Sequence, residues 1–215
     1  MRFDNKKVLV TGASRGIGRA VAQQFASAGA QVAVHCRADQ EAARDTLASL
    51  DGTGHVLCAG DLADAPTVQR IVTEVITSLG GLDILVNNAG IFEAHPIDEV
   101  SFSKWQTAWQ RTLAVNLTGP ANLCWCAVEH MREHGGGRIV NVSSRGAFRG
   151  EPRCPAYGAS KAGLNALTQS LAQHVASLGI FVGAVAPGFV ETDMAKTVLQ
   201  GPDGDAIRHQ SPLGR

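Results

Sequence analysis

Tyr157 and Lys161 are residue types that can hold and move a proton, and their spacing brings them together. Tyr157 is the only tyrosine in the 215 residues, and Lys161 follows it by four positions. Residues four apart lie on one face of a helix, so the phenol and the ammonium can point into one cavity. A nearby cation favours the phenolate, so we expect the pKa of Tyr157 to fall from about 10 toward neutrality. The pair predicts a general acid or base, with accidental spacing on an exposed helix as the alternative.

A glycine-rich turn indicates a second kind of chemistry, the binding of phosphate groups. It follows the first apolar segment and reads Thr11-Gly12-Ala13-Ser14-Arg15-Gly16-Ile17-Gly18, with a helical pattern after it. Glycine lets the backbone approach a pyrophosphate closely, and the start of the next helix offers unpaired amides and a positive dipole end. A strand, such a turn and a helix in succession are the context that dinucleotide binding requires. The predicted contacts are Gly12, Ser14, Arg15, Gly16, Ile17 and Gly18.

The end of the second apolar segment predicts which dinucleotide binds. Domains that prefer NAD carry Asp or Glu there, to bond the ribose hydroxyls. This chain instead reads His35-Cys36-Arg37, and Arg15 of the turn is expected on the same side. A guanidinium is a planar donor that suits phosphate, so Arg15 and Arg37 predict NADP(H). Two alternatives stay open, because Arg37 could be a solvated loop residue and Asp39 lies nearby.

Asp61 and Leu62 follow the third apolar segment and extend this predicted site. The sequence Gly60-Asp61-Leu62 would place the Asp61 carboxylate against the adenine amine. The alternative is structural, with Asp61 as the cap of the helix that begins at Ala65.

These residues need a scaffold that brings them together, and the hydrophobic pattern indicates one. Short apolar segments alternate with longer helical patterns, which is typical of a parallel sheet covered by helices on both faces. The expected strands are 8–10, 31–34, 55–58, 84–86, 138–142 and 180–185, and the expected helices are 18–28, 40–49, 65–79, 104–134 and 157–178. Right-handed crossovers then give an α/β fold, a doubly wound, Rossmann-like parallel sheet of six strands. No linker or repeat indicates a second domain, so we expect one domain over residues 1–215.

Composition argues against several classes of function. Nineteen basic residues balance nineteen acidic ones, so no overall field favours nucleic acid or an anionic membrane. No apolar run approaches the roughly 20 residues that span a bilayer, and the first residues lack the apolar stretch of a signal peptide. The five cysteines are scattered, which indicates reduced, mostly buried thiols in a cytoplasmic protein. No spacing suggests a metal site, and a solvated surface position is expected for His95, His130, His134, His174 and His209.

Six motifs occur in register with the expected strands and helices. They are Thr11-Gly12-x3-Gly16-x-Gly18, Asn87-Asn88-Ala89-Gly90, Asn116, Ser144, Tyr157-x3-Lys161 and Pro187-Gly188. In this order, along nearly the whole chain, they resemble the short-chain dehydrogenase/reductase family. The resemblance implies a doubly wound sheet and NAD(P)-dependent interconversion of a carbonyl and an alcohol.

The resemblance also implies a role for each catalytic residue. Tyr157 would supply the proton and Ser144 would hydrogen-bond the substrate oxygen. Lys161 would favour the phenolate and hold the nicotinamide ribose, and Asn116 would anchor a water chain that reprotonates Tyr157. Ser143 is the competing serine, but the family's usual separation from the tyrosine selects Ser144 and leaves Ser143 structural.

Further residues are expected around the cofactor or in its support. Asn88 would contact the adenosine ribose, whereas Asn87 would tie strands together. The other implied cofactor contacts are Ala89, Gly90, Pro187, Gly188, Val190 and Thr192. Trp105, Trp109 and Leu113 repeat at helical intervals, which indicates helix packing or, by the resemblance, a contact between subunits.

Within the family, residues 188–194 and 211–215 are most similar to 3-oxoacyl-(acyl-carrier-protein) reductases. Those reductases often present basic residues near the end of the helix expected at 157–178, but Ala172 to Leu178 contain none. An acidic carrier would lack a docking face here, which weakens that substrate. Family members also continue past Gly214-Arg215 with a helix and a seventh strand. Incomplete representation of a longer protein is the expected reason, with an altered oligomer as the alternative, and it would leave an open sheet edge at the sixth strand. The polar segment 195–210, broken by Gly and Pro, resembles a substrate lid.

The sequence predicts an oxidoreductase that moves hydride between NADPH and a small ketone, a 3-oxoacyl compound or the corresponding secondary alcohol. An NAD(P)-dependent alcohol or sugar dehydrogenase is the alternative within enzymes. From a different class, a non-catalytic NADP(H)-binding sensor or scaffold would need the glycine turn but not the catalytic residues. The expected partners are a small carbonyl substrate and other copies of the chain, as a dimer or tetramer, with neither nucleic acid nor membrane.

Overall fold

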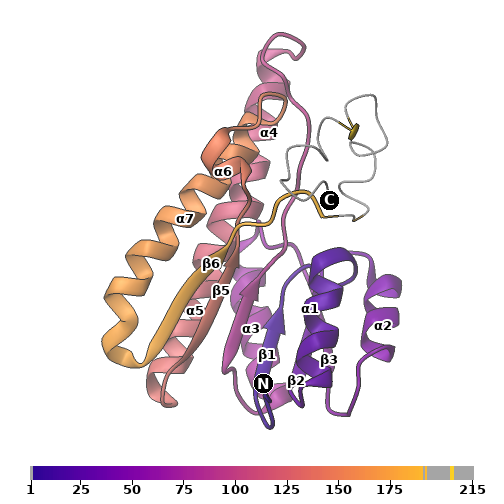
Figure 1. Cartoon of the computed structure of the whole chain (residues 1–215), viewed down its shortest axis with the longest axis vertical. Helices are drawn as coiled ribbons and strands as arrows, with labels where there is room; N and C mark the ends of the chain where they lie inside the picture. The colour runs from indigo at the N-terminus through magenta and orange to yellow at the C-terminus, as the bar shows by residue number, and fades with distance from the viewer. Residues whose placement is uncertain (1, 191, 193–203, 206–215) are drawn as a thin grey trace.

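Six parallel strands form the sheet that the hydrophobic pattern predicts (Figure 1). The structure is a computed structural model, and it describes residues 2–190, 192 and 204–205. The strands are β1 (Lys7–Val10), β2 (Gln31–Cys36), β3 (Val56–Ala59), β4 (Ile84–Asn87), β5 (Gly137–Val142) and β6 (Ile180–Val185). Their order is β3-β2-β1-β4-β5-β6, and every neighbouring pair is parallel. This confirms the predicted doubly wound, Rossmann-like sheet, in which the winding reverses between β1 and β4.

Helices cover both faces of this sheet because successive strand residues point to opposite sides. The long helices are α1 (Gly16–Ser27), α2 (Gln40–Ala48), α3 (Ala65–Leu79), α4 (Phe102–Leu113), α5 (Gly119–Glu133) and α7 (Pro155–Val175). Val8 and Val10 belong to a core that includes residues of α1 and α2, whereas Leu9 between them belongs to a core with α3 and α5. In Figure 1, α1 and α2 lie beside β1 to β3, and α7 lies along β6.

The long helix predicted over 104–134 is interrupted by a different local geometry. Between α4 and α5 the residues Ala114–Thr118 form a π turn, with helical backbone on both sides of it. A π turn adds about one residue to a helical turn, and it is often found at functional sites. The four-residue helix α6 (Gly146–Arg149) was also missed, since four residues are too few to show a hydrophobic period.

The ends of the helices explain the roles of two carboxylates. Asp64 caps α3 by accepting a hydrogen bond from Thr67 N at 3.0 Å, so the alternative that assigned this cap to Asp61 is wrong. Asp39 caps α2 by accepting from Ala42 N at 3.1 Å. A capping carboxylate stabilises the helix by satisfying an amide that has no partner within it.

The strand at the open edge carries apolar side chains. Among the described residues β6 pairs with β5 alone, and Phe181 and Val185 are 66% and 51% exposed. The lid expected at 195–210 lies, apart from residues 204 and 205, outside the described residues. None of the described helices has the length and hydropathy needed to cross a bilayer.

Buried asparagines join neighbouring strands near their carboxyl ends. Asn87 Nδ2 donates to Asn141 Oδ1 at 2.8 Å, which confirms that Asn87 ties β4 to β5. Asn141 Nδ2 in turn donates to Thr168 Oγ1 of α7 at 2.8 Å. The network therefore holds α7 against β5. Loss of one of these bonds would leave a buried polar group unsatisfied.

His35, at the end of β2, attaches the glycine-rich turn to the neighbouring strand. The ring is 2% exposed, and its Nδ1 accepts a hydrogen bond from Gly12 N at 3.2 Å. Its Nε2 lies 3.1 Å from Gly60 O. Since Nδ1 accepts, Nε2 must carry the hydrogen, so the bonded ring is the neutral Nε2–H tautomer. Burial lowers the pKa of His35 from 6.5 to about 4, despite the favourable bond to Gly60.

This burial predicts a stability that depends on pH. Between pH 6.5 and pH 4 the unfolded chain binds a proton at His35 more readily than the folded chain does. The free energy of unfolding is therefore expected to fall by about 3 kcal/mol as the pH drops through this window. Urea unfolding at a series of pH values measures it. The substitution His35→Gln should flatten this part of the profile, whereas His174→Gln, at an exposed position on α7, should leave it unchanged. Parallel profiles for the wild type and His35→Gln would contradict the assignment.

Candidate active site

A cavity of about 450 Å³ lies at the carboxyl ends of the strands, where a parallel sheet of this topology binds its ligand. Residues that follow all six strands line it. Of the predicted site residues, those on its wall are Gly12, Ser14, Arg15, Gly16, Ile17, Arg37, Asp61, Leu62, Asn88, Ala89, Gly90, Ser144, Tyr157, Lys161, Pro187, Gly188, Val190 and Thr192. Gly18 and Asn116 do not line it.

The glycine-rich turn presents backbone to one end of this cavity. Gly12 has φ +63°, and a Cβ atom there would lie 2.8 Å from Ala89 Cα, so only glycine fits. Arg15, the N-cap of α1, makes no side-chain capping bond. The Arg15 side chain thus leaves the first backbone amides of α1, a twelve-residue helix, uncapped. Uncapped amides at the start of a helix can donate hydrogen bonds to a phosphate group.

Two residues predicted to contact the cofactor also hold this turn in place. A Cβ on Gly18 would lie 2.3 Å from Gly12 O, so Gly18 allows α1 to pack against the turn. Asn88 Nδ2 donates to Thr11 O at 2.8 Å and to Gly12 O at 3.1 Å. Both amide hydrogens of Asn88 are used within the protein. Its contact with the adenosine ribose stays a prediction.

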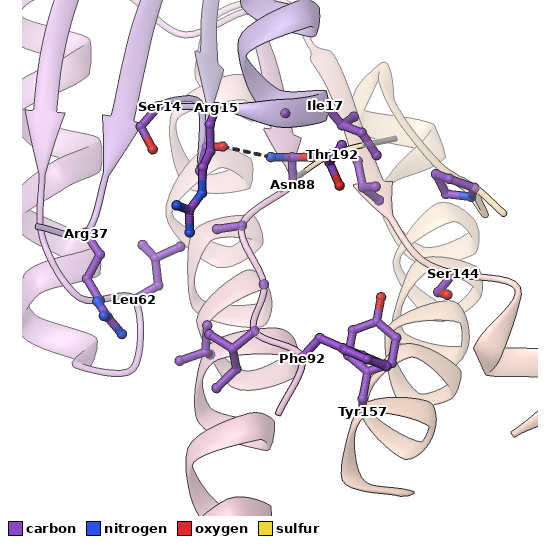
Figure 2. A pocket seen from close by; sticks show the side chains of 18 of the residues that line it. Ser14, Arg15, Ile17, Arg37, Leu62, Asn88, Phe92, Ser144, Tyr157 and Thr192 are labelled. Carbon is purple, nitrogen blue, oxygen red and sulfur yellow. Dashed lines mark hydrogen bonds between the residues drawn. The ribbon is translucent and has the colours of Figure 1, made fainter. Parts of the chain in front are cut away.

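Two arginines and two carboxylates line this end of the cavity. Figure 2 shows Arg15 and Arg37 with Leu62 at the end opposite to Tyr157. Both arginines line the cavity and are exposed. The nearby Asp39 carboxylate is committed to capping α2. Asp61 also lines the cavity; its Oδ1 accepts from Ala63 N at 3.0 Å, and its Oδ2 lies 3.5 Å from Arg111 of α4.

Ser144 and Tyr157 lie at the opposite end of the cavity (Figure 2), and Lys161 lines the cavity beside Tyr157. Tyr157 lies in the first turn of α7, and Lys161 lies one turn later with its Nζ 5.8 Å from the centre of the tyrosine ring. The Lys161 Nζ donates to Val142 O at 2.7 Å. Ser144 Oγ accepts from Gly146 N at 3.1 Å, so its own hydrogen is available to donate. Phe92 packs edge-on against Tyr157, with 4.8 Å between ring centres.

The expected lowering of the Tyr157 pKa is wrong for this structure. Burial is the largest influence and raises the pKa of Tyr157, and the nearby Glu151 and Cys154 raise it further. Only the hydrogen bond with Ser144 lowers it. Burial also lowers the pKa of Lys161 from 10.5 to about 8. The spacing of the pair gave no measure of burial, and burial disfavours the charged form of both residues.

Asn116 lies in the π turn, and its side chain is fully used by neighbouring groups. Its Oδ1 accepts from Ile91 N at 2.8 Å, and its Nδ2 donates to Ile91 O at 2.9 Å and to Ser160 Oγ at 3.2 Å. The side chain thus joins the loop after β4 to α7. A water chain through Asn116 stays a prediction. Ser143 is buried and its Oγ donates to Lys161 O at 3.3 Å, in keeping with a structural role.

Two residues that no motif singled out lie in this region, in loops that were expected to form the pocket walls (91–103 and 145–156). His95 was predicted at the surface but is 2% exposed. Its Nε2 accepts from Ala156 N at 3.1 Å, directly before Tyr157, and its Nδ1 lies 2.8 Å from Glu93 O. Glu151 lines the cavity as well. Neither His95 nor Glu151 belongs to one of the six motifs. The only sequence signal for a role at the site is that each lies in a loop next to a motif residue.

Comparisons with known proteins agree with this geometry. The model of the short chain dehydrogenase family matches residues 6–203. D-threitol dehydrogenase of Mycolicibacterium smegmatis is 38% identical over 216 residues, covering 100% of this chain and 81% of that protein. The 3-oxoacyl-(acyl-carrier-protein) reductase of Staphylococcus aureus is 39% identical, covering 98% of this chain and 84% of that protein.

Solved structures give the same result. A short chain dehydrogenase from Burkholderia cenocepacia, crystallised in complex with NADP, superposes with a TM-score of 0.88 at 37% identity. The match covers 100% of this chain and 86% of that one. Since the sheet order, the motifs and these relatives all agree, the chain belongs to the short-chain dehydrogenase family and is an oxidoreductase of the hydride-transferring kind.

Proposed function

We propose that this protein interconverts a carbonyl compound and a secondary alcohol with NADP(H) as the hydride carrier. The observation that carries the proposal is one cavity with Ser144 and Tyr157 at one end and Arg15 and Arg37 at the other (Figure 2), in which the Lys161 Nζ lies 5.8 Å from the centre of the Tyr157 ring. We further propose that residues 1–215 act as a single catalytic domain, that the protein is cytoplasmic, and that it assembles with copies of itself.

The proton chemistry follows from the groups around Tyr157. Because the pKa of Tyr157 is raised, the phenol is protonated at neutral pH and can donate its proton to a substrate oxygen. Ser144 is positioned to hydrogen-bond the same oxygen, since Gly146 N holds its Oγ as an acceptor. In the reductive direction, a carbonyl carbon takes hydride and its oxygen takes the Tyr157 proton, which yields the alcohol.

Lys161 acts through its charge and its fixed position. With a pKa of about 8 it is mostly protonated at neutral pH, and the bond to Val142 O orients the ammonium. The ammonium would hold the ribose hydroxyls of the cofactor and stabilise the phenolate that remains after proton transfer.

The residues present fit a dinucleotide with a 2′-phosphate. The turn around Gly12 has no space for a side chain, and the uncapped start of α1 suits the pyrophosphate. Among the described residues Arg15 and Arg37 form no ion pair, and the Asp39 carboxylate, which also lines the cavity, accepts a hydrogen bond from Ala42 N of α2. When bound, the cofactor would supply or accept the hydride. The crystallised relative from Burkholderia cenocepacia with NADP supports the same choice.

The similar proteins are named for different substrates. The arrangement of the site argues for catalysis over a purely binding role. One relative is named for D-threitol, a polyol, and another for a 3-oxoacyl group on a carrier protein. A sensor or scaffold would have no need for a tyrosine, a serine and a lysine that converge on the same end of the cavity. We therefore propose a catalyst, with small ketones, 3-oxoacyl compounds and polyols as the candidate substrates.

Removing the phenol tests the proton donor. We expect Tyr157→Phe to lower kcat by about 100- to 10,000-fold, because the general acid is lost. NADPH binding should be nearly unchanged, since the ring can still pack against Phe92. Ser144→Ala should lower kcat by about 100-fold or more, whereas Ser143→Ala, the neighbouring serine, should retain most of the activity. NADPH oxidation at 340 nm and NADPH titration by fluorescence measure the two effects. Full turnover by Tyr157→Phe would remove this residue as the acid.

Reversing a charge tests the choice of cofactor. We expect Arg37→Asp to shift the ratio of kcat/KM for NADPH over NADH toward NADH by at least about tenfold, because an attraction to the 2′-phosphate becomes a repulsion. Arg44→Asp on α2 makes the same change of charge outside the cavity wall and should leave the ratio within about twofold. A ratio that is equal in the wild type and Arg37→Asp would refute a phosphate contact.

A further inference from the structure

Glu151 places a carboxylate beside Gly146, two residues after the predicted catalytic serine Ser144. It lies in the loop between α6 and α7, and its backbone oxygen accepts from Cys154 N at 2.9 Å at the start of α7. A Cβ added to Gly146 would lie 2.4 Å from Glu151 Oε1, so the carboxylate occupies the space beside that glycine. Gly146 N is the group that donates to Ser144 Oγ. Gly146 therefore lies between the Glu151 carboxylate and the Ser144 hydroxyl, which would hydrogen-bond the substrate oxygen.

The close packing of this loop keeps the carboxylate in position. A Cβ on Gly158, the residue after Tyr157, would lie 3.4 Å from Glu151 N. The absence of side chains at Gly146 and Gly158 thus lets the loop approach α7 closely. The negative charge of Glu151 also acts on Tyr157, the proposed catalytic acid, and contributes to raising its pKa.

The Glu151 carboxylate has an unmet capacity to accept hydrogen bonds. Among the described residues its side chain forms no hydrogen bond and no ion pair, although it is only partly exposed and lines the cavity. Burial raises the pKa of Glu151, while the positive charges of Arg145 and Arg149 lower it. A purely apolar substrate that covered this carboxylate would leave a desolvated acceptor without a donor, which is unfavourable.

The charges around the carboxylate indicate what kind of donor suits it. A substrate with its own carboxylate would be repelled by Glu151. A substrate with an ammonium group would meet the positive charges of Arg145 and Lys161, which also line the cavity. A neutral hydroxyl avoids both penalties, because it can donate to the carboxylate and accept from a nearby cation.

We propose that Glu151 determines substrate specificity by accepting a hydrogen bond from a hydroxyl group close to the reacting carbonyl. The substrates are then hydroxyketones and, in the oxidative direction, polyols. This inference rests on the proposed carbonyl–alcohol chemistry of the same site, and it selects the hydroxylated substrates over plain ketones and acyl chains.

The test compares two ketones of nearly equal size, hydroxyacetone and butanone, in which a hydroxyl replaces a methyl group. We expect the wild-type kcat/KM for hydroxyacetone to exceed that for butanone by at least about tenfold. Glu151→Met should reduce this preference to about threefold or less, by lowering the value for hydroxyacetone and leaving or raising that for butanone. Glu151→Gln should fall between the two, since its amide oxygen still accepts a hydrogen bond. Glu93→Met removes a nearby carboxylate that does not line the cavity and should keep the wild-type preference.

The outcomes separate this inference from the proposed function. If the wild type reduces neither ketone nor oxidises any polyol with either cofactor, the proposed function fails and the inference fails with it. If the wild type reduces both ketones equally well, only the role of Glu151 is overturned, even where the variants do not fold. An equal loss on both ketones in Glu151→Met would show a structural role. A preference for aminoacetone over hydroxyacetone would show that the carboxylate selects an ammonium group instead.

Discussion

Parallel hydrogen bonding between the six strands determines where every functional group of this protein lies. In a parallel sheet all strands end at the same edge, so the six loops that follow them meet there. The chain leaves β1 in one direction toward β2 and β3, and returns on the other side at β4. The helices that make these crossovers diverge at this point, which leaves a cavity that residues from Gly12 to Thr192 can share. A single antiparallel strand would place its loop at the opposite edge, away from the site.

Much of the fold and the position of the site could be predicted from the sequence, because both depend on local patterns. The period of apolar residues locates the strands, and the succession of strand, glycine turn and helix locates the phosphate end. Tyr157 and Lys161 share a helical face because four residues make about one turn. Such features need no knowledge of what surrounds them.

The parts that could not be predicted depend on residues far apart in the sequence. His95 is buried because the loop after β4 folds over the start of α7, and no spacing within 91–101 indicates that. The pKa of Tyr157 depends on how much water the surrounding loops exclude, so the neighbouring lysine alone gave the wrong direction. Glu151 looks like an ordinary loop residue until the packing against Gly146 is seen. Gly18 and Asn88 matched the motif, yet their immediate contacts are within the protein.

The π turn has a consequence for the rotational phase of the long helix. An α-helix advances about 100° per residue, so one extra residue in a turn rotates everything before it by about that angle relative to everything after it. Trp105 on α4 is thereby turned to pack against His95, while α5 keeps its own apolar face against α3. The same sequence wound as one regular α-helix would rotate α4 by about that angle around its axis, whereas a single deletion between Ala114 and Thr118 would give a regular helix with α4 and α5 in their present relative orientation. The side chains of α4 and α5 therefore do not follow one continuous helical period. A sequence alignment that treats 102–133 as one regular helix will assign the residues of either α4 or α5 to the wrong helix face.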